Sequence, residues 1–115
     1  MLGAASLAHA DVIPITWDAA GRFEQRFDVA PGKFAEACER LRSGTTVEWR
    51  FETTAPADFN IHYHAGEAVV TPAQETQVQR AHGTLRVASD QDYCWMWSNK
   101  GAVPISTTLS LGQGR

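Results

Sequence analysis

The sequence predicts an all-β protein, an antiparallel β-sandwich of about seven to nine short strands. Two observations carry this prediction. Tyr93, Trp95 and Trp97 occupy alternate positions, and in an extended strand this spacing places all three side chains on one face. Similar alternating segments recur along the chain between glycine, proline and serine–glycine turn signals, a spacing that is typical of a sandwich.

The aromatic residues define the expected core. Each buried aromatic side chain removes on the order of 150–250 Å² from water, so a strand with three of them contributes more than any other short segment. Trp49 and Phe51 alternate with charged residues in the same way. We therefore expect the core to be built on Trp49, Phe51, Tyr93, Trp95 and Trp97.

The first third of the chain contains three predicted strands. Residues 12–17 are β-branched and aromatic, and Pro14 marks them as an edge strand or as the start of a strand. Residues 23–29 form the second strand, which a Pro-Gly turn ends. Residues 34–41 also fit a helical period, but the turn signals on either side favour a strand that ends near Cys38.

The central segments show the clearest alternation. Residues 47–51 and 59–64 alternate apolar with polar side chains, which indicates strands buried on one face. Residues 53–57 contain a proline and are expected to form a loop between them. Residues 67–71 are a further strand, and Pro72 is expected to end it.

The C-terminal part is expected to end the sheet. Residues 74–80 are polar and fit either a strand or a loop, and a short strand follows at residues 85–87. The aromatic strand at 93–97 comes next. Residues 103–111 alternate as a last strand, and residues 112–115 should fray.

Composition limits the possible functions. The chain of 115 residues carries a net charge of −3 with scattered lysines and arginines, so nucleic acid is not an expected partner. No apolar run reaches the 18 or so residues that span a bilayer. The segment Ala8-His9-Ala10 fits a small-x-small cleavage site. We interpret residues 1–10 as a signal-peptide remnant and residues 11–115 as one periplasmic or secreted domain; the alternative is a disordered Ala-rich terminus.

The two cysteines, Cys38 and Cys94, have three possible states. In an oxidising compartment a cysteine pair in a small domain is most often a disulfide, which here would close a loop of about 57 residues. The alternatives are two buried free thiols or a pair of metal ligands. Composition alone leaves this choice open.

His62 and His64 suggest a metal site. On a strand the two imidazoles point the same way, and Cys94 and Met96 do likewise on their own strand. If these strands are neighbours, imidazole and soft sulfur would converge in a donor set that selects copper. The alternative is that His62 and His64 belong to a polar, solvated face, and a bridged Cys94 could not act as a thiolate ligand.

No enzyme class is indicated. The sequence lacks a Gly-x-Ser-x-Gly elbow, a phosphate loop and a His-Glu-x-x-His motif. Cys94 with a nearby histidine could act as a thiol nucleophile and base, but a strand interior beside Trp95 gives a substrate poor access. We therefore expect a non-enzymatic protein.

The second half of the chain resembles the GOLD (Golgi dynamics) domain, a β-sandwich of vesicular cargo receptors and some lipid-transfer proteins. The resemblance covers roughly residues 34–111, and its matching residues are Gly44, Trp49, Phe51, Asp58, Phe59, Ile61, Tyr93, Trp95, Trp97 and Asn99. It implies a disulfide between Cys38 and Cys94, although the family's second cysteine would fall at Met96, two residues further along the same strand face. It also implies a module that binds a protein or a lipid, without catalytic residues.

Together these features predict an exported, non-enzymatic module that binds a protein or an envelope component, without an assured cofactor. The alternative is a small periplasmic copper protein that uses His62, His64 and Met96, with or without Cys94. The deciding observation is whether the strand at His62 lies beside the strand at Cys94.

Overall fold

The chain is described by a computed structural model that covers residues 11–114, in which seven strands form and no helix does. The strands are β1 (Asp11–Pro14), β2 (Arg22–Val29), β3 (Phe34–Leu41), β4 (Thr46–Ala65), β5 (Ala68–Arg86), β6 (Gln91–Ser98) and β7 (Ile105–Gly114). The all-β prediction is confirmed for these residues. The predicted signal segment, residues 1–10, lies outside them. Within residues 11–114 no helix could cross a membrane.

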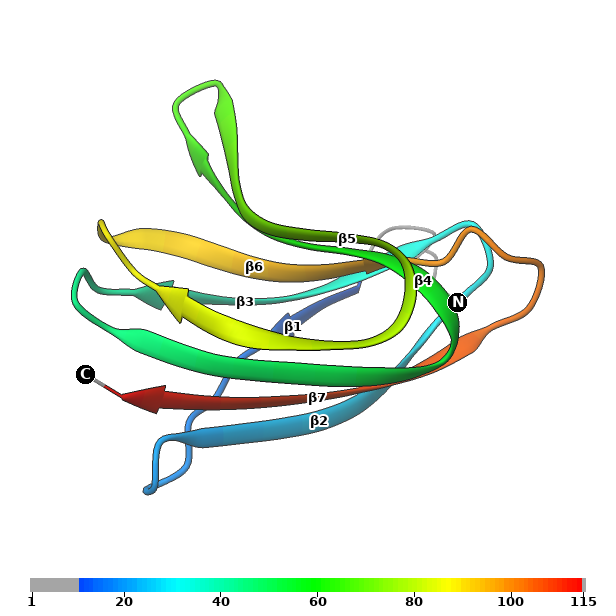
Figure 1. Cartoon of the computed structure of the whole chain (residues 1–115), viewed down its shortest axis with the longest axis horizontal. Coiled ribbons are helices and arrows are strands. Elements are labelled where there is room, and N and C mark those ends of the chain that lie inside the picture. Colours follow the sequence, from blue (N-terminus) through cyan, green and yellow to red (C-terminus); the bar gives the residue numbers. More distant parts are fainter. Residues whose placement is uncertain (1–10, 115) are drawn as a thin grey trace, which may run out of the picture.

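All seven strands belong to one sheet with the order β1-β3-β6-β4-β7-β2, and β5 lies beside β4 (Figure 1). The first half of β4 pairs with β7, and its second half pairs with β6. Because β4 and β5 continue through both halves, the sheet curls around the core. The predicted sandwich of separate sheets is therefore replaced by a single curled sheet, and its β1–β3 pair is parallel.

The curl explains why two predicted boundaries are wrong. Residues 53–57, expected to form a loop, continue β4, and the register with β5 shifts between Glu52 and Ala57. A shift of this kind bends a strand, and it accommodates Pro56, which has no N–H to donate. Pro72 does not end β5, because it lies on an edge strand opposite the register shift between Ile61 and Tyr63, and a proline is tolerated at such a position.

Other boundaries differ by a few residues. The third strand runs past Cys38 to Leu41, because it pairs with β6 over its whole length. Residues 74–80, left open between strand and loop, are part of β5. The last strand begins at Ile105 instead of residue 103, and it reaches Gly114, although residues 112–115 were expected to fray.

The core lies on the inner face of the curl. The five predicted core aromatics are all buried: Trp49, Phe51, Tyr93, Trp95 and Trp97. Trp97 is the centre of an aromatic cluster, with ring centroids 5.1 Å from Phe27, 5.5 Å from Phe51 and 5.4 Å from Phe59. Such contacts stabilise the fold beyond the area they bury. They also join β2, β4 and β6 across the curl.

Asn99 fixes the chain where β6 ends. Its buried side-chain amide donates hydrogen bonds to the carbonyl oxygens of Val29, at 3.0 Å, and Val103, at 2.8 Å. Its carbonyl oxygen accepts one from the Gly101 N–H at 2.9 Å. This single side chain therefore ties the loop before β7 to the end of β2, which holds the rim of the sheet in place.

Candidate functional site

The predicted site residues lie on the outer face of β3, β6 and the second half of β4. The strand at His62 is the direct neighbour of the strand at Cys94, and these two residues face each other in the register. Two successive rows cross the three strands: Cys38, Cys94 and His62 in one, and Glu36, Met96 and Asn60 in the next. Residues that pair in register present their side chains on the same face, so these six side chains share one surface.

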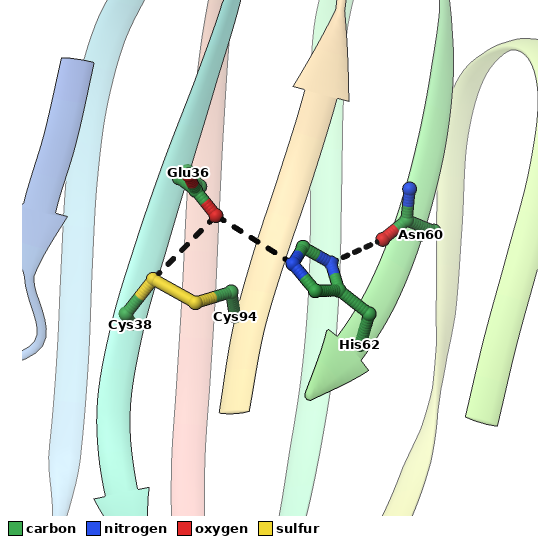
Figure 2. Close-up of a disulfide and its surroundings, with 5 residues drawn as sticks. All are labelled: Glu36, Cys38, Asn60, His62 and Cys94. Carbon is green, nitrogen blue, oxygen red and sulfur yellow. Dashed lines mark hydrogen bonds and ion pairs between the residues drawn. A yellow bond between two sulfur atoms is a disulfide. The ribbon is translucent and has the colours of Figure 1, made fainter. Parts of the chain in front are cut away.

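Cys38 and Cys94 form a disulfide across β3 and β6 (Figure 2). Their Cα atoms are 4.1 Å apart, and the bridge is half-buried. Of the three states that composition left open, the structure therefore contains the bridged one. In this state Cys94 has no thiolate, so it is neither a copper ligand nor a nucleophile.

His62 is buried, with 8% of its surface exposed, which excludes the solvated position considered for it. Its Nδ1 lies 2.7 Å from the Oδ1 atom of Asn60, and its Nε2 lies 3.8 Å from the Oε1 atom of Glu36 (Figure 2). An amide oxygen can only accept a hydrogen bond, so Nδ1 carries the proton. This contact fixes the ring with Nε2 facing the carboxylate of Glu36.

Burial lowers the pKa of His62, and the nearby His64 lowers it further, while the carboxylate of Glu36 acts in the opposite direction. The first of these effects is the largest because the charged imidazolium loses its hydration inside the protein. His62 is therefore held largely neutral at pH 7.

This lowered pKa predicts a pH dependence of stability. Around the ordinary histidine pKa of about 6.5, the unfolded chain binds more protons at His62 than the folded chain does. The contribution of neutral His62 to the free energy of unfolding should therefore have its full value above about pH 6.5. It should be lost as the pH drops through the lowered pKa of His62. Urea unfolding between about pH 7.5 and pH 5 measures this slope.

His62→Gln should flatten that part of the pH profile. His64→Gln is the matched control, because His64 is exposed on the same strand; the slope should persist in this variant with only a small change. An unaltered slope in His62→Gln would contradict the assignment.

The remaining predicted metal ligands lie close by but are not equivalent. The rings of His62 and His64 are edge to face, with centroids 5.4 Å apart, and His64 is exposed. Met96 is half-buried in the row of Glu36 and Asn60. Copper binding by His62, His64 and Met96 stays a prediction.

Two of the six side chains in these rows, Glu36 and Asn60, were not among the predicted site residues. Alternation along a strand already places Glu36 on the same face as Cys38, and Asn60 on the same face as His62. The missing information was the order of the strands, because only the placement of β6 between β3 and β4 brings the two faces together.

A second surface feature is an open groove on the outer face of the other half of the sheet. It has a volume of about 1040 Å³ and runs over β2, β7, β4 and β5. Ser110 and Gly112 of β7 form a floor of small residues, and long charged side chains, including Arg50 and Glu24, flank it. No local pattern of the sequence indicates this groove, since its floor and walls come from strands far apart in the chain.

The β4–β5 hairpin also projects from the sheet, away from the other strands (Figure 1). Near its tip, Val69 is 56% exposed and Val70 is 37% exposed. The hairpin therefore presents exposed apolar side chains away from the body of the sheet.

Comparisons with known proteins establish the fold. No protein-family model matches the chain, and no curated protein matches it significantly. The solved structures that resemble it include PliG of Aeromonas hydrophila, a periplasmic inhibitor of g-type lysozyme, with a TM-score of 0.70 at 11% identity over 92% of this chain and 98% of that one.

Two further periplasmic inhibitors of g-type lysozyme have the same architecture. PliG of Salmonella Typhimurium matches with a TM-score of 0.63 at 8% identity, over 90% of this chain and 99% of that one. A mutant of PliG from Escherichia coli matches with a TM-score of 0.65 at 10% identity, over 93% and 100%. The resemblance to the GOLD domain finds no support in these comparisons and stays a prediction.

Proposed function

We propose that this protein is exported and that it binds and inhibits a g-type lysozyme without catalytic activity of its own. The observation that carries the proposal is the likeness to Aeromonas hydrophila PliG, which extends over 92% of this chain and 98% of that protein. The likeness therefore concerns nearly the whole of both chains and not a shared strand pair alone.

Two features of the chain support this proposal. The Cys38–Cys94 disulfide is the kind of bridge that forms and persists in oxidising compartments such as the periplasm. The bridge also removes the thiolate that a thiol enzyme would need, so that alternative loses its nucleophile. Binding, in contrast, requires only a rigid surface of the right shape.

We place the contact with the lysozyme at the tip of the β4–β5 hairpin. Val69 and Val70 expose apolar surface there, and the hairpin projects from the rest of the sheet (Figure 1). The two strands are paired up to Ala65 and Ala68, so the tip is held by the sheet and loses little conformational entropy on binding.

The direct test is inhibition of peptidoglycan lysis by a purified g-type lysozyme, with a c-type lysozyme as the specificity control. Inhibition should rise with the concentration of this protein for the g-type enzyme. Val69→Glu should weaken that inhibition by about tenfold or more, since burying a carboxylate against the partner costs at least about 1.4 kcal/mol.

The matched variant is Val103→Glu, because Val103 is 61% exposed but lies in the loop before β7. It should inhibit as well as the wild type does. Absence of both inhibition and binding of g-type lysozyme would refute the proposed function. Equal losses in the two variants would refute the placement at the hairpin.

A further inference from the structure

The cluster around the disulfide contains four potential metal donors. The carboxylate oxygen of Glu36, the imidazole nitrogen of His62 and the sulfur of Cys94 all lie within 4.8 Å of one another. The Sγ atom of Cys38 lies 3.8 Å from the same Glu36 oxygen. A bridged sulfur has no hydrogen to donate, so this last approach is a contact and not a hydrogen bond.

The orientation of His62 points to a cation. Because Nδ1 donates its proton to Asn60, the lone pair of Nε2 is directed at the carboxylate of Glu36, 3.8 Å away. Two electron-rich atoms that face each other are stabilised by a positive charge between them. Zn²⁺ binds imidazole nitrogen at about 2.0–2.1 Å and carboxylate oxygen at about 2.0–2.2 Å, so an ion fits between this pair.

The hydrogen bond from His62 to Asn60 is of the kind that orients metal-binding histidines. A ligating imidazole almost always donates its second ring N–H to a carbonyl or carboxylate oxygen, which fixes its orientation. Here the 2.7 Å contact from Nδ1 to Asn60 Oδ1 has that role. Burial of His62 further restricts the ring to this position.

We propose that reduction of the Cys38–Cys94 disulfide converts this cluster into a Zn²⁺ site with four ligands: Cys38, Cys94, His62 and Glu36. A dithiol reductant supplies two electrons and two protons; the S–S bond breaks, each cysteine becomes a thiol, and the dithiol closes to its own disulfide. Zn²⁺ then binds both sulfurs as thiolates and displaces their two protons to solvent.

The donor set favours Zn²⁺ over copper. Two thiolates, one imidazole and one carboxylate suit a tetrahedral Zn²⁺ ion, whereas Cu(I) prefers soft sulfur ligands to a hard carboxylate oxygen. The alternative copper set would use His64 and Met96 in place of Glu36. That copper set was predicted with or without Cys94, so the two sets share His62 and can share Cys94. His64 and Met96 belong only to the copper set and Glu36 only to the zinc set, so variants of these residues separate them.

The sheet can hold the four ligands in place without the bridge. β3 pairs with β6 from Phe34 to Leu41, and β6 pairs with β4 from Asp58 to His62. On the inner face, behind these ligands, Ala37 and Trp95 are fully buried. The proposed site is therefore largely formed before the metal arrives, and this proposal does not depend on lysozyme binding.

The test measures Zn²⁺ affinity by competition with a chromophoric chelator, using the intact protein either oxidised or reduced with a phosphine. The reduced protein should bind one Zn²⁺ far more tightly than the oxidised protein. Co²⁺ in place of Zn²⁺ should give the thiolate-to-cobalt absorption band and the visible bands of a tetrahedral site. Circular dichroism of the reduced protein checks that the sheet persists.

Variants test each ligand. Asn60→Ala should weaken binding to the reduced protein by about 10- to 100-fold through loss of its support of the imidazole. His62→Gln and Glu36→Gln should weaken it at least as much. His64→Gln, two residues along the same strand, should leave the affinity unchanged.

Three outcomes would overturn the proposal. One is equal Zn²⁺ affinity of the oxidised and reduced proteins. Another is an affinity of the reduced protein that is insensitive to His62→Gln and Glu36→Gln, since the two cysteines alone would then bind the ion. The third is a loss of binding in His64→Gln, which would favour the alternative set.

Discussion

Trp97→Ala should reduce the free energy of unfolding by about 3–5 kcal/mol, the range for removing a large aromatic side chain from a core. The side chain is fully buried at the centre of the cluster that joins Phe27, Phe51 and Phe59. Its removal leaves a cavity bordered by β2, β4 and β6. Each of these strands is hydrogen-bonded to a neighbour in the sheet, so the surroundings can collapse only partly. Chemical denaturation of wild type and variant measures the difference.

Trp97→Phe is the control that separates volume from polarity. The indole N–H groups of Trp95 and Trp97 have no hydrogen-bond partner among the protein atoms of the described residues. Leaving a buried donor unpaired costs about 1–3 kcal/mol, so replacing Trp97 by phenylalanine removes that cost while opening a smaller cavity. The loss in Trp97→Phe should be well below that in Trp97→Ala. Similar losses would show that the cavity does not decide the effect.

Such losses are large for a domain of this size, because natural domains are stable by only about 5–15 kcal/mol. The sequence does indicate which side chains should be this important for stability. Tyr93, Trp95 and Trp97 alternate, and alternation in a strand fixes which face each side chain occupies whatever strands lie beside it. The core aromatics could therefore be identified without knowing the topology.

The bend in the sheet could not be predicted in this way. Residues 53–57 contain Pro56 and two alanines, a composition that fits a loop as well as it fits an irregular strand. In the structure they form the point where β4 leaves β7 and continues beside β6. That continuity depends on pairing with β5 and hence on contacts between residues far apart in the sequence.

The sequence could indicate only some residues of the candidate metal site, because the site also depends on which strands are neighbours. His62 and Cys94 were expected to be close only if their strands were neighbours, and the register places them opposite each other. The burial of His62 and its contacts with Glu36 and Asn60 follow from the placement of β3 on the far side of β6. Strand order is a property of the whole sheet, so no local pattern contains it.

The second large effect concerns the disulfide. In the chain-entropy model a bridge between residues 56 positions apart stabilises a domain by about 4 kcal/mol, because it restricts the unfolded chain. The double variant Cys38→Ser, Cys94→Ser should lose stability of that order relative to the oxidised wild type. Urea denaturation under oxidising conditions gives the value. A loss below about 1 kcal/mol would mean that the unfolded chain gains little freedom when the bridge is removed.

The reduced wild type is the informative comparison, since it lacks the bridge but keeps both sulfur atoms. Without metal, it should be about as unstable as the double serine variant. A ligand that binds only the folded state adds about 2.7 kcal/mol at a concentration of 100 times its dissociation constant. Zn²⁺ should therefore restore much of the lost stability to the reduced wild type and none to the serine variant. Equal effects of Zn²⁺ on both would mean that the ion acts elsewhere on the protein, and the bridge would then have a purely structural role.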